Sequence, residues 1–204
     1  TIDAMGTQPN IAQAIRDRGA DYILSVKDNQ PTLADSMQDF FGAFQASPDR
    51  TPHGFDETVE KDHGRLEIRR CYVFDQIECL HAPQRWPDLK SFAVIASERT
   101  IKGKTTREHR FYITSLSADA ARLNRAVRQH WRVENSLHWC MDVVFDDDQM
   151  RARTGHAAHN FAVLRHIALN LIRLAPLKRK GGLKVRRLIA ATSDAYRAQL
   201  LGLT

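Results

Sequence analysis

The sequence predicts an α/β fold in which helices flank a mixed β-sheet that carries a β-rich insertion. Three observations predict it. A strand, a short helix and a second strand follow one another at the start, β-like alternation fills the middle, and helical spacing of apolar residues returns after residue 117. With 204 residues, 43% hydrophobic and 26% charged, the chain is long enough to bury one sizeable core.

The first strand, helix and strand are expected at residues 1–4, 10–18 and 21–27. Pro9 stands just before the helix and Gly19 just after its last residue, which is typical of helix starts and ends. A strand, a helix and a strand at this spacing are typical of a βαβ unit, whose two strands are parallel. We therefore expect a parallel pair at the beginning of the sheet.

The middle of the chain predicts a helix, a loop and then β-structure. Residues 33–44 have a helical pattern, and residues 47–62 collect prolines, a glycine and many charges, which predicts a loop. Lys102, Gly103 and Lys104 form a plausible hairpin turn. This region is either an antiparallel addition to the sheet or a β insertion. Its expected strands are residues 65–74, 92–97 and 110–115.

Helices are expected again from residue 118 onward, one to about residue 142 and another over residues 156–174. In the second helix, Phe161, Leu164 and Ala168 keep the spacing of a core face. Four parts follow from these patterns: residues 1–48 as a partial core, 49–116 as the β-rich insertion, 117–175 as core helices, and 176–204 as a basic C-terminal segment.

Composition narrows the class of protein. No stretch approaches the roughly 20 apolar residues of a membrane-spanning helix, and no signal peptide is visible, so a cytoplasmic location without membrane contact is expected. Three cysteines without regular spacing argue against a disulfide scaffold and a cysteine-based zinc site. The sequence opens on Thr1, inside an expected strand, which predicts an N-terminally truncated fragment.

The net charge of +6 is concentrated near the C-terminus. Residues 149–193 hold ten Lys or Arg and no Asp or Glu, and such a segment suits a polyanion because phosphate contacts release bound counterions. A solvated basic tail that aids solubility is the alternative. The likeliest DNA contacts in this segment are its most clustered basic residues, Lys178, Arg179, Lys180, Lys184, Arg186 and Arg187.

The richest cluster of chemical groups spans residues 130–148. On an α-helix, steps of four and seven residues return to nearly the same side, so Glu134, His138 and Met141 are expected to share a face. The alternative is that Glu134 forms an ion pair on a solvated face with Arg128 or Arg132. Two tryptophans, at positions 131 and 139, either pack the helix or stack on an unpaired base, and packing is favoured.

Several segments together resemble the bacterial insertion-sequence transposases that include the H-repeat-associated proteins, a branch of the DDE transposases with an RNase H-like core. Their joint occurrence, in this order and over nearly the whole chain, carries the resemblance. They are residues 1–8 (TIDAMGTQ), 19–30 (GADYILSVKDNQ), 130–135 (HWRVEN), 138–145, 155–160 (GHAAHN) and 164–170 (LRHIALN).

The resemblance implies two catalytic and metal-binding residues. Asp3 corresponds to the second acidic residue of the family's triad, and Glu134 to the third. The first aspartate lies on an earlier strand that this sequence does not contain, so the fragment is expected to be inactive. His130 and Met141 stand where the wider group carries Arg and Lys, and the basic roles are assigned instead to Lys27, Arg128 and Arg132.

The implied function is that of a DNA transposase, which cleaves and transfers strands at insertion-sequence ends with Mg²⁺ or Mn²⁺. Such reactions are in-line displacements at phosphorus, and two ions held by carboxylates assist both the attacking and the leaving oxygen. The expected partners are double-stranded DNA at the nucleoid and a second copy of the chain. The alternative is an inactive truncated transposase remnant that binds DNA or a full-length partner.

Overall fold

The computed structural model describes residues 1–62, 64–175 and 181–203. The chain divides into two compact units, Thr1–His130 and Trp131–Thr204, and each is described by itself. Unit 1 contains the sheet with the helices that cover it, and unit 2 is helical. The chain is therefore of the mixed α/β class that the sequence predicts.

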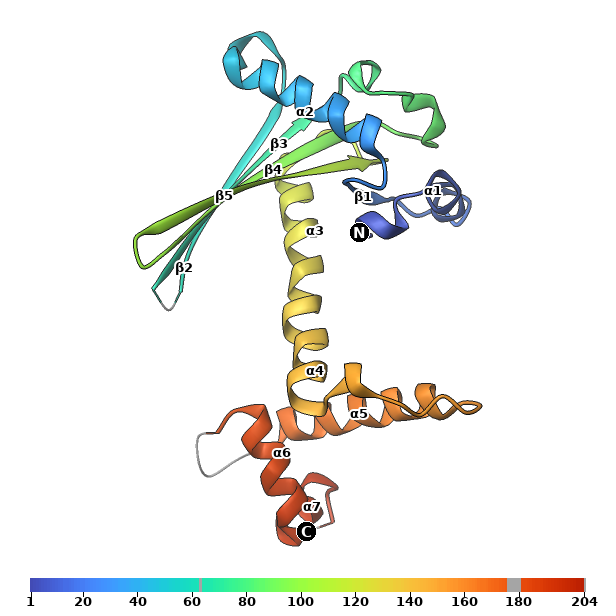
Figure 1. The fold of residues 1–204 in the computed structure, drawn as a ribbon, viewed down its shortest axis with the longest axis vertical. Helices are drawn as coiled ribbons and strands as arrows, with labels where there is room; N and C mark the ends of the chain where they lie inside the picture. The colour runs from blue at the N-terminus through green and yellow to red at the C-terminus, as the bar shows by residue number, and fades with distance from the viewer. Residues whose placement is uncertain (63, 176–180, 204) are drawn as a thin grey trace. The chain divides into compact units, whose positions relative to one another are not determined.

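Unit 1 is built on a five-stranded antiparallel sheet in the order β1-β5-β4-β3-β2 (Figure 1). The predicted parallel pair near the start is reduced to a single parallel bridge between Ile2 and Leu24, beside β1. Because β2 to β5 join the same sheet as β1, the middle region is an antiparallel addition to that sheet. The strands are β1 (Ile23–Val26), β2 (Gly54–Asp62), β3 (Arg65–Phe74), β4 (Ser91–Ile101) and β5 (Lys104–Thr114).

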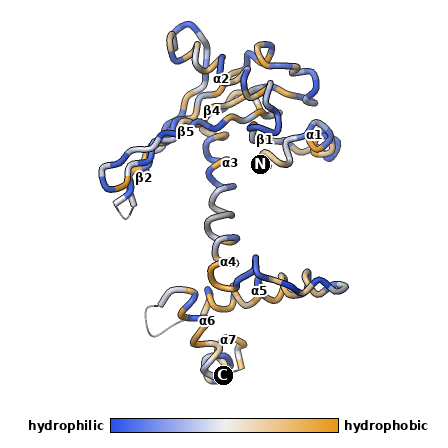
Figure 2. The backbone as a smooth tube through the Cα atoms, viewed as in Figure 1, coloured by the Kyte–Doolittle hydropathy of each residue, from blue (hydrophilic) through white to orange (hydrophobic). Residues whose placement is uncertain are grey.

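The turn between β4 and β5 confirms the predicted hairpin. Lys102 and Gly103 both have positive φ, 49° and 79°, as the two central residues of a tight type I′ turn require. Both strands are longer than predicted. Their outer halves are solvent-exposed and carry polar side chains, so no alternation of apolar and polar residues marks them as strands. Figure 2 shows these outer ends as mainly hydrophilic.

The loop predicted for residues 47–62 is wrong in its second half. Only residues 47–53 are irregular, including a short 3₁₀ turn at Pro48–Arg50, and β2 begins at Gly54. β2 is the edge strand of the sheet and pairs only with β3. Since much of such a strand faces solvent, its charged composition resembles that of a loop.

One face of the sheet packs against helix α2 (Pro31–Ala46), which covers it in Figure 1. The helix confirms the one predicted for residues 33–44, with one more turn distributed over its two ends. Its buried residues Met37 and Phe41 join strand residues such as Phe92 in one apolar core. Phe92 also stacks on Phe74, with ring centroids 5.1 Å apart. Helix α1 (Pro9–Arg16) contributes the buried Ala12 to the same core.

The N-terminal part of helix α3 (Ala120–Val133) packs against the opposite face of the sheet (Figure 1). Leu123 and Val127 are buried on this helix. Its N-terminal end approaches β2 so closely that a Cβ atom on Gly54 would lie 3.5 Å from the Ala120 Cβ. Asn124 donates a 2.7 Å hydrogen bond to the Asp56 carboxylate on β2, which fixes the helix along the sheet.

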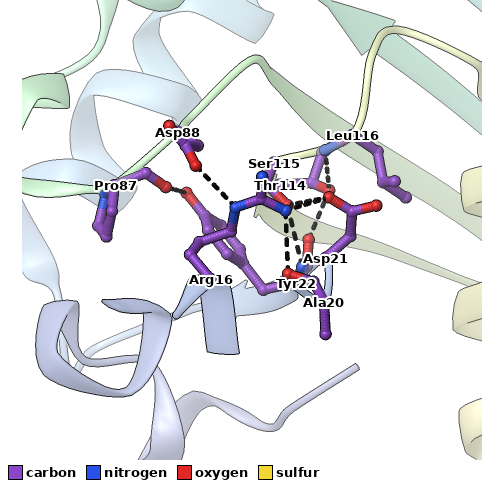
Figure 3. A network of polar contacts seen from close by, with 9 residues as sticks. All are labelled: Arg16, Ala20, Asp21, Tyr22, Pro87, Asp88, Thr114, Ser115 and Leu116. Carbon is purple, nitrogen blue, oxygen red and sulfur yellow. Dashed lines mark hydrogen bonds and ion pairs between the residues drawn. The ribbon is translucent and has the colours of Figure 1, made fainter. Parts of the chain in front are cut away.

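A polar network anchors the beginning of β1 (Figure 3). Arg16 binds Asp88 at 2.8 Å and Asp21 at 2.6 Å, which joins the end of α1 to the segment before β4. The Tyr22 hydroxyl donates to Pro87 O, and the Tyr22 amide donates to Ser115 Oγ. Burial raises the pKa of Tyr22. This network fixes the strand beside which Asp3 lies.

Unit 2 continues the helix that α3 begins. A π-helical turn at Glu134–His138 leads into α4 (Trp139–Phe145), and α5 confirms the predicted second helix as Ala157–Leu174. Two shorter helices follow, α6 (Leu183–Thr192) and α7 (Asp194–Leu200). Met141, Leu169 and Tyr196, on α4, α5 and α7, are buried. Among the described residues, no helix is long and apolar enough to cross a membrane.

Candidate active site

Asp3 follows directly on the parallel contact between Ile2 and β1. The Ile2 amide donates to Ile23 O over 3.0 Å, and the Ser25 amide donates to Ile2 O over 3.1 Å. The chain then leaves the sheet in a single 3₁₀ turn, Ala4–Gly6. Asp3 therefore stands at the carboxyl end of a strand segment, the position where α/β sheets commonly bind ligands.

The turn after Asp3 needs a glycine at its end. A Cβ atom on Gly6 would lie only 2.4 Å from Cγ2 of Ile2, far inside van der Waals contact. A side chain at this position would push the turn away from the strand that it follows. Gly6 thus lets the backbone fold back over Ile2 and sets where Asp3 stands.

Three polar side chains hold this turn in place. The buried Thr7 hydroxyl donates to Ser25 O over 2.6 Å. Gln30 donates to Thr7 O over 3.1 Å, and Asn29 donates to Ala4 O. Sequence reasoning gave these residues no role, because donors and acceptors lie 18 to 25 residues apart and no spacing rule connects them. The only available signal was their polar character directly beside an apolar strand.

The Asp3 carboxylate faces solvent and is not used to cap the turn. Its side chain is 62% exposed, and no side-chain hydrogen bond caps the Ala4–Gly6 turn. Among the described residues, the ion-pair partner found for it is the His130 imidazole, with Nε2 3.7 Å from Oδ1. Asp3 is thus oriented by its backbone while its carboxylate oxygens remain available.

His130 comes from the helix on the far side of the sheet. It lies near the end of α3, and its Nε2 atom is buried without a hydrogen-bond partner although part of the ring is exposed. Two segments that carry the resemblance, residues 1–8 and 130–135, therefore meet at Asp3 and His130. No spacing rule connects Asp3 with His130, so this contact does not follow from the sequence.

The other predicted acidic residue, Glu134, begins the π-helical turn after α3. The side chains of Glu134 and Arg132 lie outside the part of the chain that the structure describes, and the convergence of Glu134 with Asp3 stays a prediction. The expected shared face of Glu134, His138 and Met141 assumed an α-helix. A π turn closes its hydrogen bonds over five residues instead of four, so the α-helical spacing on which that expectation rests does not apply through Glu134–His138. Single π turns are frequent at functional sites.

Asp3 fits a divalent cation by its chemistry. Mg²⁺ prefers carboxylate and water oxygens, and the exposed carboxylate at the strand end offers both oxygens without an internal cap. Within the described residues, no cluster of three or more His, Cys, Asp or Glu side chains is arranged to hold a metal ion. Asp3 alone supplies a partial site, and further ligands are required.

Two of the predicted DNA contacts lie on unit 1 in different surroundings. Lys27 follows β1 and is exposed. It lies near Glu108, whose pKa is lowered mainly by the Arg110 guanidinium and more weakly by Lys27. Arg128 forms an ion pair with Glu60 on β2, so its charge is partly compensated inside the protein.

The predicted contacts in unit 2 divide in the same way. Lys184 is exposed on α6. Arg186 donates to Ile172 O at 3.0 Å and Ala175 O at 3.3 Å, at the end of α5. Arg187 lies over the Phe145 ring, 5.6 Å from its centroid, and 4.0 Å from Asp146. The predicted contacts Lys178, Arg179 and Lys180 lie outside the described residues.

Comparison with known proteins gives a consistent result. Residues 1–171 match the family described as transposase DDE domain. The chain is 36% identical to the H repeat-associated putative transposase YhhI of Escherichia coli K12 over 98% of its length. It is 37% identical to the putative transposase YncI of Escherichia coli O157:H7, also over 98%. The protein YbfL of strain K12 is similar at 36% identity.

These relatives are longer than the chain. The matched regions cover 54% of YhhI, 54% of YbfL and 52% of YncI, so the chain spans about half the length of the curated relatives it matches. No solved structure matches the chain.

Proposed function

The chain belongs to the family of transposases with a DDE domain, and from this premise we propose that it takes part in metal-dependent cleavage and strand transfer of DNA at insertion-sequence ends. The observation that carries the proposal is the meeting of Asp3 and His130. Two segments that resemble the family, far apart in sequence, come together at an exposed carboxylate.

Asp3 and Glu134 are the proposed metal-binding and catalytic carboxylates. Asp3 is supported by its position at a strand end and by its accessible oxygens. Glu134 is supported by its place in the HWRVEN segment. A bound Mg²⁺ or Mn²⁺ would activate the attacking oxygen and stabilise the leaving oxygen at phosphorus.

The chain's own contribution to such a site is orientation. Thr7, Asn29 and Gln30 hold the backbone around Asp3 from the neighbouring β1 segment. The backbone that carries Asp3 therefore needs little reorganisation when a ligand arrives, and preorganisation of this kind lowers the barrier of a displacement.

DNA affinity is proposed to come mainly from the acid-free segment, residues 149–193. Lys184 and Arg187 are the described residues of the predicted set that lie exposed on α6. Lys178, Arg179, Lys180 and Arg186 belong to the same proposal, as do Lys27, Arg128 and Arg132. The DNA would be double-stranded and would be bound through its phosphates.

Cleavage of DNA that carries the element ends tests the catalytic proposal. The assay compares the 204-residue chain with a version extended upstream to the length of the relatives, each with Mg²⁺ or Mn²⁺. Activity is expected in the extended protein and is expected to be lost in its Asp3→Asn and Glu134→Gln variants. Asp28→Asn, at another exposed acidic residue of unit 1, is the matched control and should remain active.

Three outcomes would contradict parts of the proposal. Full activity of the Glu134→Gln variant would remove Glu134 from the mechanism, and full activity of Asp3→Asn would remove Asp3. Equal activity without a divalent ion would remove the metal. If the protein is an inactive transposase remnant, neither the 204-residue chain nor the extended version should cleave DNA. An extended protein that binds DNA without cutting it would therefore favour the inactive remnant.

The salt dependence of DNA binding tests the basic segment. Replacing Lys178, Lys180 and Lys184 with Ala should reduce the slope of log affinity against log salt by up to about three, at roughly 0.9 per phosphate contact. Arg50, Lys61 and Lys90, exposed in unit 1, form the charge-matched control. An unchanged slope in the first triple variant would show that the segment does not contact phosphates.

A further inference from the structure

The contact between His130 and Asp3 carries one inference beyond the proposed function. Nε2 of His130 is buried and has no hydrogen-bond partner, and Oδ1 of Asp3 lies 3.7 Å away. Buried polar atoms of folded proteins are nearly always hydrogen-bonded, so an unpartnered ring nitrogen that faces a carboxylate calls for an explanation.

We propose that His130 is a positioning residue for Asp3: its Nε2–H donates to Oδ1 and fixes the orientation of the carboxylate that is to bind the metal ion. The purpose of this contact, which is metal binding, rests on the proposed function. The contact itself does not, because both residues belong to unit 1. At 3.7 Å the pair is just beyond hydrogen-bond length. The hydrogen bond therefore requires a rotation of the exposed Asp3 side chain that shortens this distance.

His130 stands on a well-fixed part of its helix. Val127, one turn before it, is buried, and Asn124 binds Asp56 at 2.7 Å. Arg128 pairs with Glu60 on the same strand. The imidazole is therefore held by the sheet through α3, and the Asp3 backbone is held by the sheet through β1.

The backbone contacts around Asp3 and the His130 side chain have different effects on the carboxylate. The backbone contacts of Thr7, Asn29 and Gln30 set where Asp3 stands but leave its carboxylate free to rotate. A donor from a second, independently fixed element removes that freedom. Partners that orient a metal-binding carboxylate in this way typically contribute 10- to 100-fold to metal affinity or activity.

Nitrogen NMR of the metal-free chain tests the contact directly. We expect the His130 ring to carry its proton on Nε2 and its ring resonances to shift when Asp3 is replaced by Ala. Met5→Ala, a change at the 91% exposed residue two positions away, is the control and should leave those resonances unchanged. A His130 ring that does not respond to Asp3→Ala would overturn the inference.

Manganese binding tests the purpose of the contact. The His130→Ala variant should bind Mn²⁺ about tenfold more weakly than the native chain. His130→Gln, which retains an N–H donor of similar reach, should restore most of the affinity, and Gln129→Ala on the exposed neighbour should have no effect. Unfolding curves of each variant verify that the fold is intact.

The outcomes separate this inference from the proposed function. If Asp3→Ala leaves Mn²⁺ binding unchanged, the metal site of the proposed function fails, and the NMR experiment still decides whether His130 holds Asp3. If Asp3→Ala abolishes binding while His130→Ala binds normally, the positioning role is wrong and the metal site stands. If His130→Gln is as weak as His130→Ala, donation from an N–H group is wrong.

Discussion

Unit 1 gathers its large apolar side chains around one sheet, whereas unit 2 leaves most of its own at the surface. Phe74, Phe92 and Ile113 are completely buried in unit 1. In unit 2, Leu164 is 58% exposed and Leu188 is 64% exposed, and the buried residues of its helices lie on α4, α5 and α7. Unit 1 carries Asp3 and His130, so that part of the candidate site is built on the better-packed half of the chain.

This difference in burial indicates that unit 1 contributes most of the favourable free energy of folding. Burial of apolar area is the main favourable contribution to folding, and regions with few buried contacts open locally at low cost. Unit 1 is therefore expected to behave as a stable scaffold. Unit 2 is expected to open more readily, with its proposed phosphate contacts on mobile helices.

Amide hydrogen exchange tests directly whether unit 1 is more stable than unit 2. We expect amides of β3 and β4 to exchange at least about a hundredfold more slowly than those of α5 and α6, which corresponds to an opening free energy higher by about 2.7 kcal/mol. Mass spectrometry of peptic fragments measures both regions in one experiment. Equal protection in the two units would show that unit 2 is as stable as the sheet.

A matched pair of substitutions tests the same difference through the free energy of unfolding. Phe92→Ala removes a completely buried ring that packs against Phe74 and Phe40, and should reduce the free energy of unfolding by about 3–5 kcal/mol. Leu188→Ala, at an exposed position of α6, should change it by less than about 0.5 kcal/mol. Urea titrations followed by circular dichroism measure both, and a large loss in Leu188→Ala would mean that unit 2 buries this residue in solution.

The sequence predicted the elements of unit 1 best where burial imposes a pattern. β3 has the predicted bounds, and the helix expected at residues 33–44 lies within α2, because both place apolar residues against the core. The outer halves of β4 and β5 and all of β2 were not predicted. Their residues face solvent, so hydrogen bonding to neighbouring strands, and not side-chain burial, makes them strands.

The candidate site was predictable in part. Asp3 follows from its motif and from the strand before it. The contact with His130 does not follow from spacing, because it depends on α3 crossing the far face of the sheet. The shared face expected for Glu134, His138 and Met141 stays a prediction, and nothing in the residue pattern signals the π turn at Glu134–His138.

Alkaline pH provides a smaller test of how closed the sheet is. Burial, with a further contribution from Asp56, raises the pKa of the Cys71 thiol to about 12. In the unfolded chain a cysteine loses its proton near pH 8.5. Above about pH 9, loss of the thiol proton therefore stabilises the unfolded state relative to the folded state. The free energy of unfolding should fall by up to about 1.4 kcal/mol per pH unit until about pH 12.

The Cys71→Ala variant isolates this contribution, because it lacks the thiol and should show a shallower decline of stability between pH 9 and 11. Burial also raises the pKa of Tyr22, so Tyr22→Phe removes a second part of the decline. Unfolding titrations at a series of pH values measure the slopes. A Cys71→Ala slope as steep as that of the native chain would indicate that water reaches this thiol in the folded state.

The smallest expected effect concerns Arg186 at the end of α5. Arg186→Ala should destabilise unit 2 by about 1–2 kcal/mol, because it removes charged donors from two terminal carbonyls. Lys184→Ala, on the same helix, should change stability by less than about 0.5 kcal/mol. Thermal unfolding at a helix-sensitive wavelength compares them, and equal stability of the two variants would argue against a capping role.

The charged edge strand β2 has a consequence for the behaviour of the protein at high concentration. An outermost strand presents unpaired backbone groups that can add a strand from another molecule and start aggregation. Along β2, Glu57 pairs with Arg70 and Glu60 pairs with Arg128, while Lys61 is exposed. A neighbouring sheet would have to bring its own strand against this row of charges. The charged composition that makes β2 resemble a loop in the sequence therefore also protects this edge of the sheet against pairing with another molecule.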